Sequence, residues 1–339
     1  MDRKHLIALA VILALLIAGV YFRDLLGKND TAVTDGVSSR VMASFDAGRA
    51  SLIAIGKGSG AASVELFREN GTWKVKKLWN AKADPAKVGA LLAALPALRG
   101  DLRGSDKALF RDFAITDDEA FFIKVADDAG APLFDLRVGN RSAGPGSYFM
   151  REGGEADVFF TDTPFDRLLG LFTALEEAMP ANEFWADLSL LSVDPDKVTR
   201  ITVGRVKNDV TTLMASVSRN AAGSSDWKLS GPKESLPADP GKILGFIATM
   251  NSIRAQKVEN PRNRSLGLEN PVWKLTVTQD GKETALLAGP KDAKDYVYFL
   301  KRADSPEVYR LNGYYFEDLN VTNDKFVKGP AEEKENAAS

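Results

Sequence analysis

The longest uncharged apolar stretch of the chain lies near its N-terminus, where residues 6–22 read LIALAVILALLIAGVYF. A helix of these residues would rise about 25 Å, which is the short end of a bilayer span. Arg3 and Lys4 precede the stretch, and basic flanks stay cytoplasmic. We therefore predict a transmembrane anchor with its N-terminus inside and the following chain outside the cytoplasm; the anchor residues are Leu6, Ile7, Val11, Leu15, Leu16, Val20, Tyr21 and Phe22.

Two other interpretations of this stretch stay open. A cleaved signal peptide would end in a small-x-small site, and the one candidate, near Ala18 and Gly19, is followed by bulky side chains. A buried core helix is the third interpretation. Residues 27–44 are polar and small, which is typical of a tether between an anchor and a folded part.

Beyond the tether, the hydrophobic pattern occurs twice along the chain. ASFDAGRASLIAIGK (43–57) aligns with LSVDPDKVTRITVGR (191–205). Further matches follow in the same order at offsets between 148 and 155: Trp73 with Trp227, Ala83-Asp84-Pro85 with Ala238-Asp239-Pro240, Arg111 with Arg264, Gly139 with Gly289, Tyr148 with Tyr298 and Val158 with Val308. So many matches in a constant order indicate an internal duplication.

Each copy contains runs of alternating apolar and polar residues, which are typical of half-buried strands. FFIKVADD (121–128) and PLFDLRVG (132–139) are examples from the first copy, and VWKLTVTQD (272–280) is one from the second. Asn70-Gly71 separates two such runs, and this pair favours a tight two-residue turn. We therefore expect antiparallel strands joined by hairpins.

One main helix is predicted in each copy, because the apolar spacing becomes helical after an A-D-P sequence. Asp84 and Asp239 would cap these helices, and a proline suits the first helical position. Five apolar positions coincide when the copies are shifted by 155 residues: Val88, Leu91, Leu92, Leu95 and Leu98 against Ile243, Phe246, Ile247, Met250 and Ile253. Such a stripe covers one face of a sheet.

These patterns predict an α+β fold class, in which an N-terminal transmembrane helix is followed by two tandem repeats, each an antiparallel sheet with one main helix packed on a face. The charged C-terminal tail is too poor in apolar residues to fold. The predicted divisions are an anchor at 1–26, a tether at 27–44, the first repeat at 45–172, a connecting helical segment at 173–192, the second repeat at 193–322 and a disordered tail at 323–339.

Composition narrows the chemistry. The chain has no cysteine, which excludes disulfides, thiolate zinc sites, iron–sulfur clusters and cysteine nucleophiles. Its one histidine, His5, precedes the predicted anchor. Lys and Arg number 44 against 46 Asp and Glu, so the formal net charge is -2. This charge does not favour binding to nucleic acid. We predict no catalytic residue, no cofactor and no metal site, and hence a protein that is not an enzyme.

Two local motifs could contradict this prediction. IGKGSGAAS (55–63) is rich in glycine but lacks the order of a phosphate-binding loop, so a hairpin turn is expected. Acidic clusters at 117–119 and 127–128 could serve glycoside hydrolysis or hold a cation, but their spacing matches no calcium loop. Solvated turns are the expected role of these carboxylates.

Aromatic residues gather near the end of each copy, and two interpretations stay open. They can pack under the helix at alternating sheet positions, or they can form a surface for a protein or glycan partner. The tentative partner-surface residues are Tyr148, Tyr298, Tyr314 and Tyr315.

The ordered motifs resemble a known family. WADLSLLSVDPDKVTRITV (185–203), the repeated W-K strand, the A-D-P helix start and SLGLENP (265–271) are similar to the DUF4340 domain family, although FAITDDE (113–119) departs from the pattern. The resemblance covers nearly the whole chain after the tether. It implies a bacterial membrane-anchored protein and an auxiliary component of gliding-motility-type ABC transport systems, without assigned catalytic residues.

Together, these observations favour a single-pass inner-membrane protein whose bulk stands in the periplasm. We expect a non-enzymatic scaffold whose partners are the bilayer and an ABC transporter permease or ATPase complex, with no nucleic acid. A carboxylate-dependent periplasmic hydrolase acting on glycans is one alternative, and a solute- or lipid-binding module is another.

Overall fold

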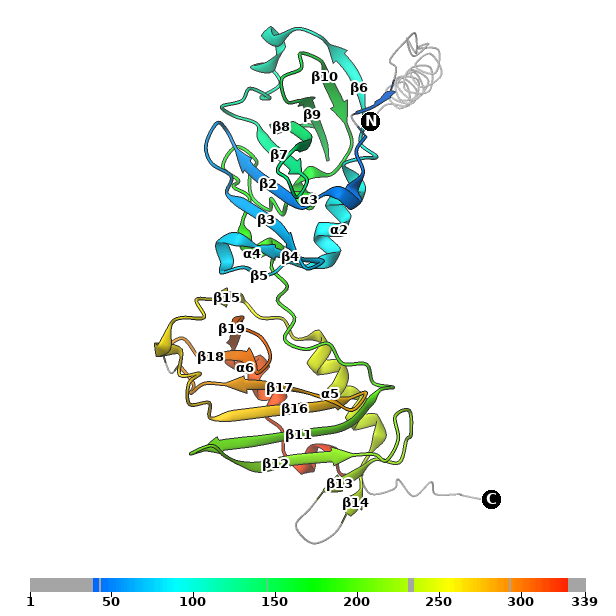
Figure 1. The fold of residues 1–339 in the computed structure, drawn as a ribbon, viewed down its shortest axis with the longest axis vertical. Coiled ribbons are helices and arrows are strands. Elements are labelled where there is room, and N and C mark those ends of the chain that lie inside the picture. The colour runs from blue at the N-terminus through cyan, green and yellow to red at the C-terminus, as the bar shows by residue number, and fades with distance from the viewer. Residues whose placement is uncertain (1–38, 43, 145, 231–234, 293, 329–339) are drawn as a thin grey trace, which may run out of the picture.

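The computed structural model describes residues 39–42, 44–144, 146–230, 235–292 and 294–328, which form two units built on antiparallel sheets (Figure 1). Within these residues, no helix is both long enough and apolar enough to cross a bilayer. The residues of the predicted anchor lie outside the described part of the chain: Leu6, Ile7, Val11, Leu15, Leu16, Val20, Tyr21 and Phe22.

The first unit places its strands in one sheet. The strands are β1 (Ser39–Val41), β2 (Leu52–Lys57), β3 (Val64–Glu69), β4 (Thr72–Val75), β5 (Ala81–Lys82), β6 (Arg99–Gly104), β7 (Phe121–Ala126), β8 (Pro132–Gly144), β9 (Ser147–Glu152) and β10 (Val158–Thr161). The α-helices are α2 (Pro85–Ala94), α3 (Phe165–Leu169) and α4 (Asn182–Trp185), and the 3-10 helices are η2 (Ala47–Arg49), η3 (Lys76–Leu78) and η4 (Lys107–Phe110).

The second unit repeats this succession. Its strands are β11 (Val198–Lys207), β12 (Val210–Ser218), β13 (Lys228–Ser230), β14 (Ser235–Pro237), β15 (Lys257–Glu259), β16 (Trp273–Gln279), β17 (Lys282–Ala288), β18 (Val297–Arg302) and β19 (Val308–Asn312). Its helices are α5 (Pro240–Ser252), α6 (Gly313–Leu319), η5 (Arg264–Leu266) and η6 (Asn323–Phe326).

The strand order is the same in both sheets. The first sheet runs β1-β6-β10-β9-β8-β7-β2-β3-β4-β5, and the second, in the same sense, runs β15-β19-β18-β17-β16-β11-β12-β13-β14. Every strand of the second sheet therefore has a counterpart in the first, and β1 is the additional strand. The prediction of two tandem units is confirmed, although strands make up more of each unit than helices do.

The main helix of each unit begins and packs as its sequence predicts. Asp84 accepts hydrogen bonds from the Ala86 and Lys87 amides, and Asp239 does the same for Gly241 and Lys242. All five stripe residues of the second unit are buried, and four of the five in the first unit are, with Leu92 packed against the core. The helices end before the predicted stripes do, since α2 stops at Ala94 and α5 at Ser252, so Leu95, Leu98 and Ile253 lie just beyond them. The stripes fix each helix on one face of its sheet.

The opposite face of each sheet is crossed by the segment that precedes the central strand, β7 or β16. A Cβ on Gly139 of the first unit would lie 2.9 Å from the Phe113 carbonyl oxygen. The matched Gly289 would place a Cβ 2.4 Å from the Leu266 carbonyl oxygen. The repeated glycine therefore marks a close backbone crossing, which explains why both copies carry it.

The units are joined by a chain segment that hydrogen bonds to both. The Asp187 amide donates to the Lys82 carbonyl of β5 at 2.8 Å, and the Leu188 carbonyl accepts from the Ala255 amide at 2.8 Å. Glu307, only 6% exposed, accepts from the Lys82 amide across the junction at 3.3 Å. The β5 edge of the first sheet is thereby held beside the second unit.

Several boundaries differ from the predicted ones. Ser39–Val41, placed in the tether, pairs with β6 as β1. The connecting segment 173–192 is not one helix, because its helical part is α4 alone. Part of the predicted tail is folded, since Asn323–Phe326 form η6 and Val327 bridges to Ala238, and residues 329–339 lie outside the described part of the chain. As predicted, residues 58–63 form the turn between β2 and β3, and Asn70 and Gly71 have φ of 50° and 77°.

Candidate functional site

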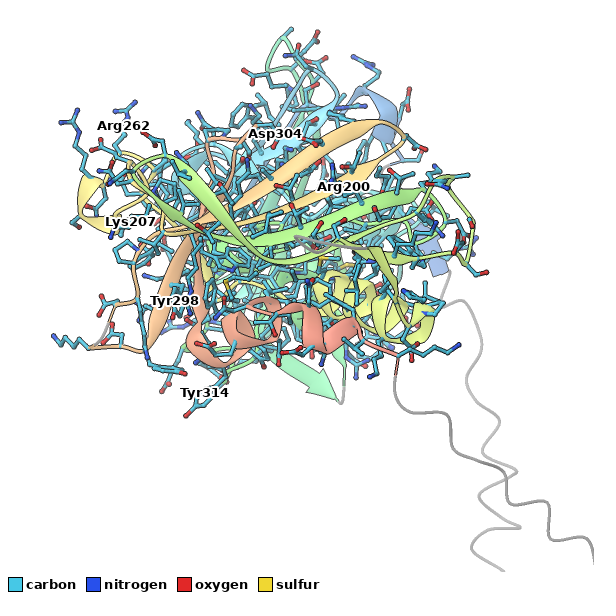
Figure 2. The ribbon with its side chains drawn as sticks, turned by 90° about the horizontal axis from the view of Figure 1, so that it is seen from below. Arg200, Lys207, Arg262, Tyr298, Asp304 and Tyr314 are labelled. Carbon is cyan, nitrogen blue, oxygen red and sulfur yellow. The ribbon has the colours of Figure 1, made fainter. Side chains whose placement is uncertain are left out.

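Exposed aromatic residues gather at the start of α6, where we name Tyr296, Tyr314 and Tyr315 the tyrosine patch. Tyr314 is 74% exposed and Tyr315 is 53% exposed, and Tyr314 projects away from the body of the unit (Figure 2). The Tyr296 and Tyr314 ring centroids lie 5.0 Å apart. The Lys291 ammonium lies 3.8 Å from the centroid of Tyr296, a cation–π arrangement. The patch thus offers flat apolar rings beside a positive charge.

The local sequence explains why these rings meet. The Asn312 side chain caps α6 by accepting a hydrogen bond from the Tyr314 amide at 2.9 Å. Gly313 donates to the Tyr296 carbonyl at 2.8 Å, and any Cβ there would lie 2.4 Å from the Tyr296 ring. Only glycine lets the helix begin this close to the ring, so Tyr314 is held next to Tyr296.

The other two predicted surface tyrosines lie elsewhere. Tyr298 is partly buried and stacks on Phe316 with centroids 3.7 Å apart. Burial and the nearby Glu317 carboxylate raise the pKa of the Tyr298 hydroxyl. Tyr148 is only 3% exposed and packs edge-on against Phe165, so it is a core residue and not part of a surface. The Tyr148 ring thus packs against α3, and the Tyr298 ring packs against α6.

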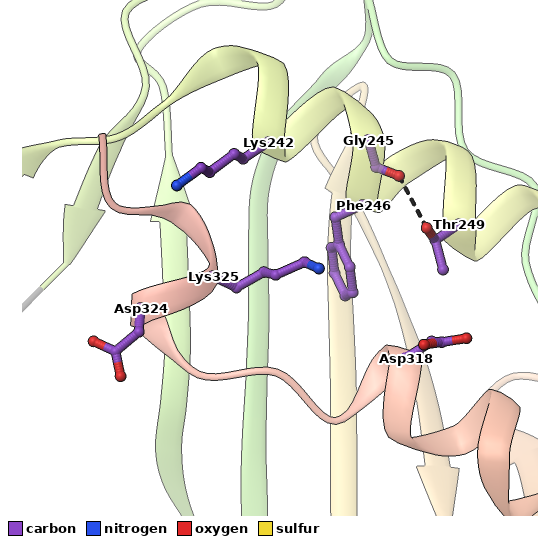
Figure 3. A pocket seen from close by; sticks show the side chains of 7 residues that line it. All are labelled: Lys242, Gly245, Phe246, Thr249, Asp318, Asp324 and Lys325. Atoms are coloured by element: carbon purple, nitrogen blue, oxygen red, sulfur yellow. Dashed lines mark hydrogen bonds between the residues drawn. The ribbon is translucent and has the colours of Figure 1, made fainter. Parts of the chain in front are cut away.

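A groove of about 520 Å³ lies between α5, α6 and η6 (Figure 3). We name it the α5–α6 groove. Phe246 of α5 lines it, although this residue is only 1% exposed. The groove begins near the C-terminal end of the helix whose start carries the tyrosine patch. Its lining residues are Lys242, Gly245, Phe246, Thr249, Asp318, Asp324 and Lys325.

The charges around the groove are balanced, because two lysines and two aspartates line it. Lys242 donates to the Val327 carbonyl at 2.8 Å, at one end of the groove. Asp318 and Asp324 point away from one another in Figure 3. Gly245 has open space where a Cβ would lie, and the Lys325 side chain extends toward Phe246 (Figure 3). The arrangement offers the ammonium groups of Lys242 and Lys325 to an occupant, whereas Phe246 is only 1% exposed.

The acidic clusters singled out from the sequence have structural partners. The Asp117 carboxylate accepts hydrogen bonds from Arg137 at 2.8 Å and from Arg151 at 2.7 Å. Asp127 accepts from the Ala131 and Ala129 amides within its turn, and the Ala131 bond is the leading cause of its lowered pKa. In the described part of the chain, no group of three or more acidic or histidine side chains is placed to hold a metal ion.

The comparison with protein families decides what this two-unit chain is. A family model described as a domain of unknown function, DUF4340, matches residues 73–226 and again residues 227–330. The chain belongs to the DUF4340 family. The two DUF4340 matches begin at Trp73 and Trp227, which are matched residues of the two copies. Comparisons with curated proteins and with solved structures gave no match.

The α5–α6 groove was not predicted from the sequence. A signal for it exists, because the offset between matched residues is 150 at Val158 and Val308 but 141 at Trp185 and Phe326. The connection from α6 to Phe326 is therefore shorter than the connection from α3 to Trp185. The longer connection of the first unit can cover a surface that stays uncovered in the second unit.

Proposed function

We propose that this DUF4340 protein is a non-enzymatic, membrane-anchored periplasmic scaffold, and an auxiliary component of an ABC-type transport complex that acts by protein–protein binding. The apolar run at residues 6–22 supplies the anchor in this proposal. The two units then stand in the periplasm and hold the binding surface. The association with a transporter rests on the family resemblance.

The tyrosine patch is the observation that carries the binding role. Large aromatic side chains are enriched in protein interfaces and dominate their energetics, whereas monomer surfaces rarely hold them in clusters. Tyr314 is 74% exposed, and its ring lies beside that of Tyr296 with centroids 5.0 Å apart. A partner that covers both rings would bury apolar surface that now faces water.

The alternative functions are favoured by no specific observation. A glycan hydrolase needs two carboxyl groups that face each other across a bond, and Asp318 and Asp324 in the groove point apart. A solute-binding module has a suitable volume in the α5–α6 groove, but such sites are mostly enclosed and apolar, whereas four of its seven lining residues are charged.

Affinity purification in mild detergent, at native expression, tests the proposal. We expect the full-length chain to recover a permease and an ATPase of one transport system, and the double variant Tyr314→Ala, Tyr315→Ala to recover at least tenfold less. Val210→Ala with Leu213→Ala is the matched control, because these residues are 66% and 55% exposed on the distant β11–β12 hairpin. Equal recovery by the tyrosine variant, or a chain found in the cytosolic fraction, would refute the proposal.

A further inference from the structure

The two units close their chains in the same way. The Trp185 carbonyl accepts from the Asp84 amide at 2.7 Å, and the Phe326 carbonyl accepts from the Asp239 amide at 2.8 Å. Trp185 and Phe326 are both fully buried. These two residues are therefore structural equivalents, and the residues before them, Phe184 and Lys325, occupy equivalent positions in the chain.

Phe184 fills the space between the helices of the first unit. A Cβ on Gly170, which caps the C-terminal end of α3, would lie 2.4 Å from the Phe184 ring. On its other side, the ring lies 4.6 Å from the Lys87 ammonium of α2. Phe172 and Trp185 complete its surroundings with centroids at 6.0 and 5.2 Å. The ring is thus held between the end of α3 and the start of α2.

The α5–α6 groove is the corresponding space in the second unit. It lies between Asp318, near the end of α6, and the first turns of α5. Lys242 matches Lys87 at the same offset as the capping aspartates. The residue at the position of Phe184 is Lys325, which supplies no ring. The second unit keeps the receiving lysine but lacks the aromatic side chain that lies beside it in the first unit.

We propose that the α5–α6 groove receives an aromatic side chain from an extended segment of a partner polypeptide, in the way that the first unit receives its own Phe184. This inference deepens the proposed function, on which it rests for the existence of a partner. The receiving group is Lys242, which can lie over the ring as Lys87 lies over Phe184. Gly245 leaves room for the ring beside the first turns of α5.

The probe is a synthetic peptide of residues 180–186, PANEFWA, which carries the natural occupant of the first unit. Fluorescence anisotropy would follow its binding to the purified full-length chain in mild detergent. We expect saturable binding that weakens at least tenfold when Phe184 of the peptide is replaced by Ala. No saturable binding, or equal binding of the two peptides, would overturn the inference.

Two variants of the protein fill the groove from within. Lys325→Phe restores the ring at the position of Phe184, and Gly245→Leu places a side chain in open space. Each should reduce peptide affinity at least tenfold. Gly89→Leu is the matched control, because Gly89 lies in α2 with equally open surroundings. The affinity of this control protein for the peptide should stay unchanged. Thermal melting would check that each variant folds. If either Lys325→Phe or Gly245→Leu does not fold, the other groove variant decides.

The other occupants of the groove give distinct outcomes. If removing residues 329–339 strengthens peptide binding tenfold, the chain's own tail fills the groove and the proposal fails. If the chain is a dimer that Lys325→Phe converts to a monomer, a second copy is the occupant and the proposal also fails. Recovery of transporter subunits without peptide binding would overturn this inference alone and leave the proposed function standing.

Discussion

The two units share one topology but differ in what covers the space beside their main helix. In the first unit the longer connection after α3 returns Phe184 to that space, whereas in the second the shorter connection after α6 leaves Lys242 and Phe246 beside a groove. The same scaffold therefore provides core in one place and a receptive surface in another. Connection length, and not the sheet or the helix stripe, decides between them.

The sharpest way to break the comparison is to remove the residues that close each unit. Trp185→Ala and Phe326→Ala should each lower the free energy of unfolding by about 3–5 kcal/mol, because each leaves a large cavity. Urea unfolding followed by circular dichroism would measure both. If only one of them is destabilising, the two closures are not equivalent.

The repeated crossing segment gives the next largest effect. Gly139→Ala and Gly289→Ala should each destabilise by about 1–3 kcal/mol, because the new methyl group meets backbone that cannot move cheaply. Thermal melting would record the loss. A tolerated methyl group at either position would show that the segment does not cross that sheet tightly.

Helix glycines should respond in the opposite direction. Gly89→Ala in α2 and Gly245→Ala in α5 should each stabilise the chain by about 0.5–1 kcal/mol, since both lie inside helices with open space at the Cβ position. Chemical denaturation would detect the gain. A loss at Gly245 alone would mean that the α5–α6 groove is filled in solution.

The smallest effect concerns acid stability. Burial alone would raise the pKa of the Asp117 carboxyl, but hydrogen bonds and charge from Arg137 and Arg151 lower it. A carboxyl with a lowered folded pKa adds stability above its unfolded value, about 3.9, and this stability is lost as the pH falls through the folded value.

Asp117→Asn should therefore destabilise by less than about 1 kcal/mol at pH 7, because solvent screens a carboxylate that is 65% exposed. The difference from the parent chain should shrink as the pH falls below about 4. Unfolding midpoints measured from pH 7 to pH 3 would check this. In the second unit Glu269 forms an ion pair with Arg264, and both side chains are exposed, so Glu269→Gln should change the stability less. A difference that grows at low pH would contradict the assignment.

Much of the fold could be predicted because its signals are local. Asp84 and Asp239 reveal helix starts through their own chemistry, and the apolar stripes reveal one covered face. The burial of Tyr148 could not be predicted from the sequence. Alternation along a strand separates its two faces, but it does not say which face lies in the core. β1 has three residues in a polar segment, too few for any periodic signal.

The site was harder to predict than the fold, for a physical reason. The tyrosine patch is visible as composition, but its exposure depends on how α6 begins over Tyr296. The α5–α6 groove exists because the connection after α6 in the second unit is shorter than the connection after α3 in the first. Residues such as Lys242 look ordinary in sequence, because what distinguishes them is the absence of the neighbour that Lys87 has.

The position of β1 has a consequence for reach. It forms the outer edge of a sheet of ten described strands, whose opposite edge, β5, adjoins the second unit. At about 4.8 Å between strands, these edges stand roughly 40 Å apart. If the segment before Ser39 is embedded in a bilayer as proposed, the first unit acts as a spacer, and the second unit meets only those molecules that extend comparably far from the lipid.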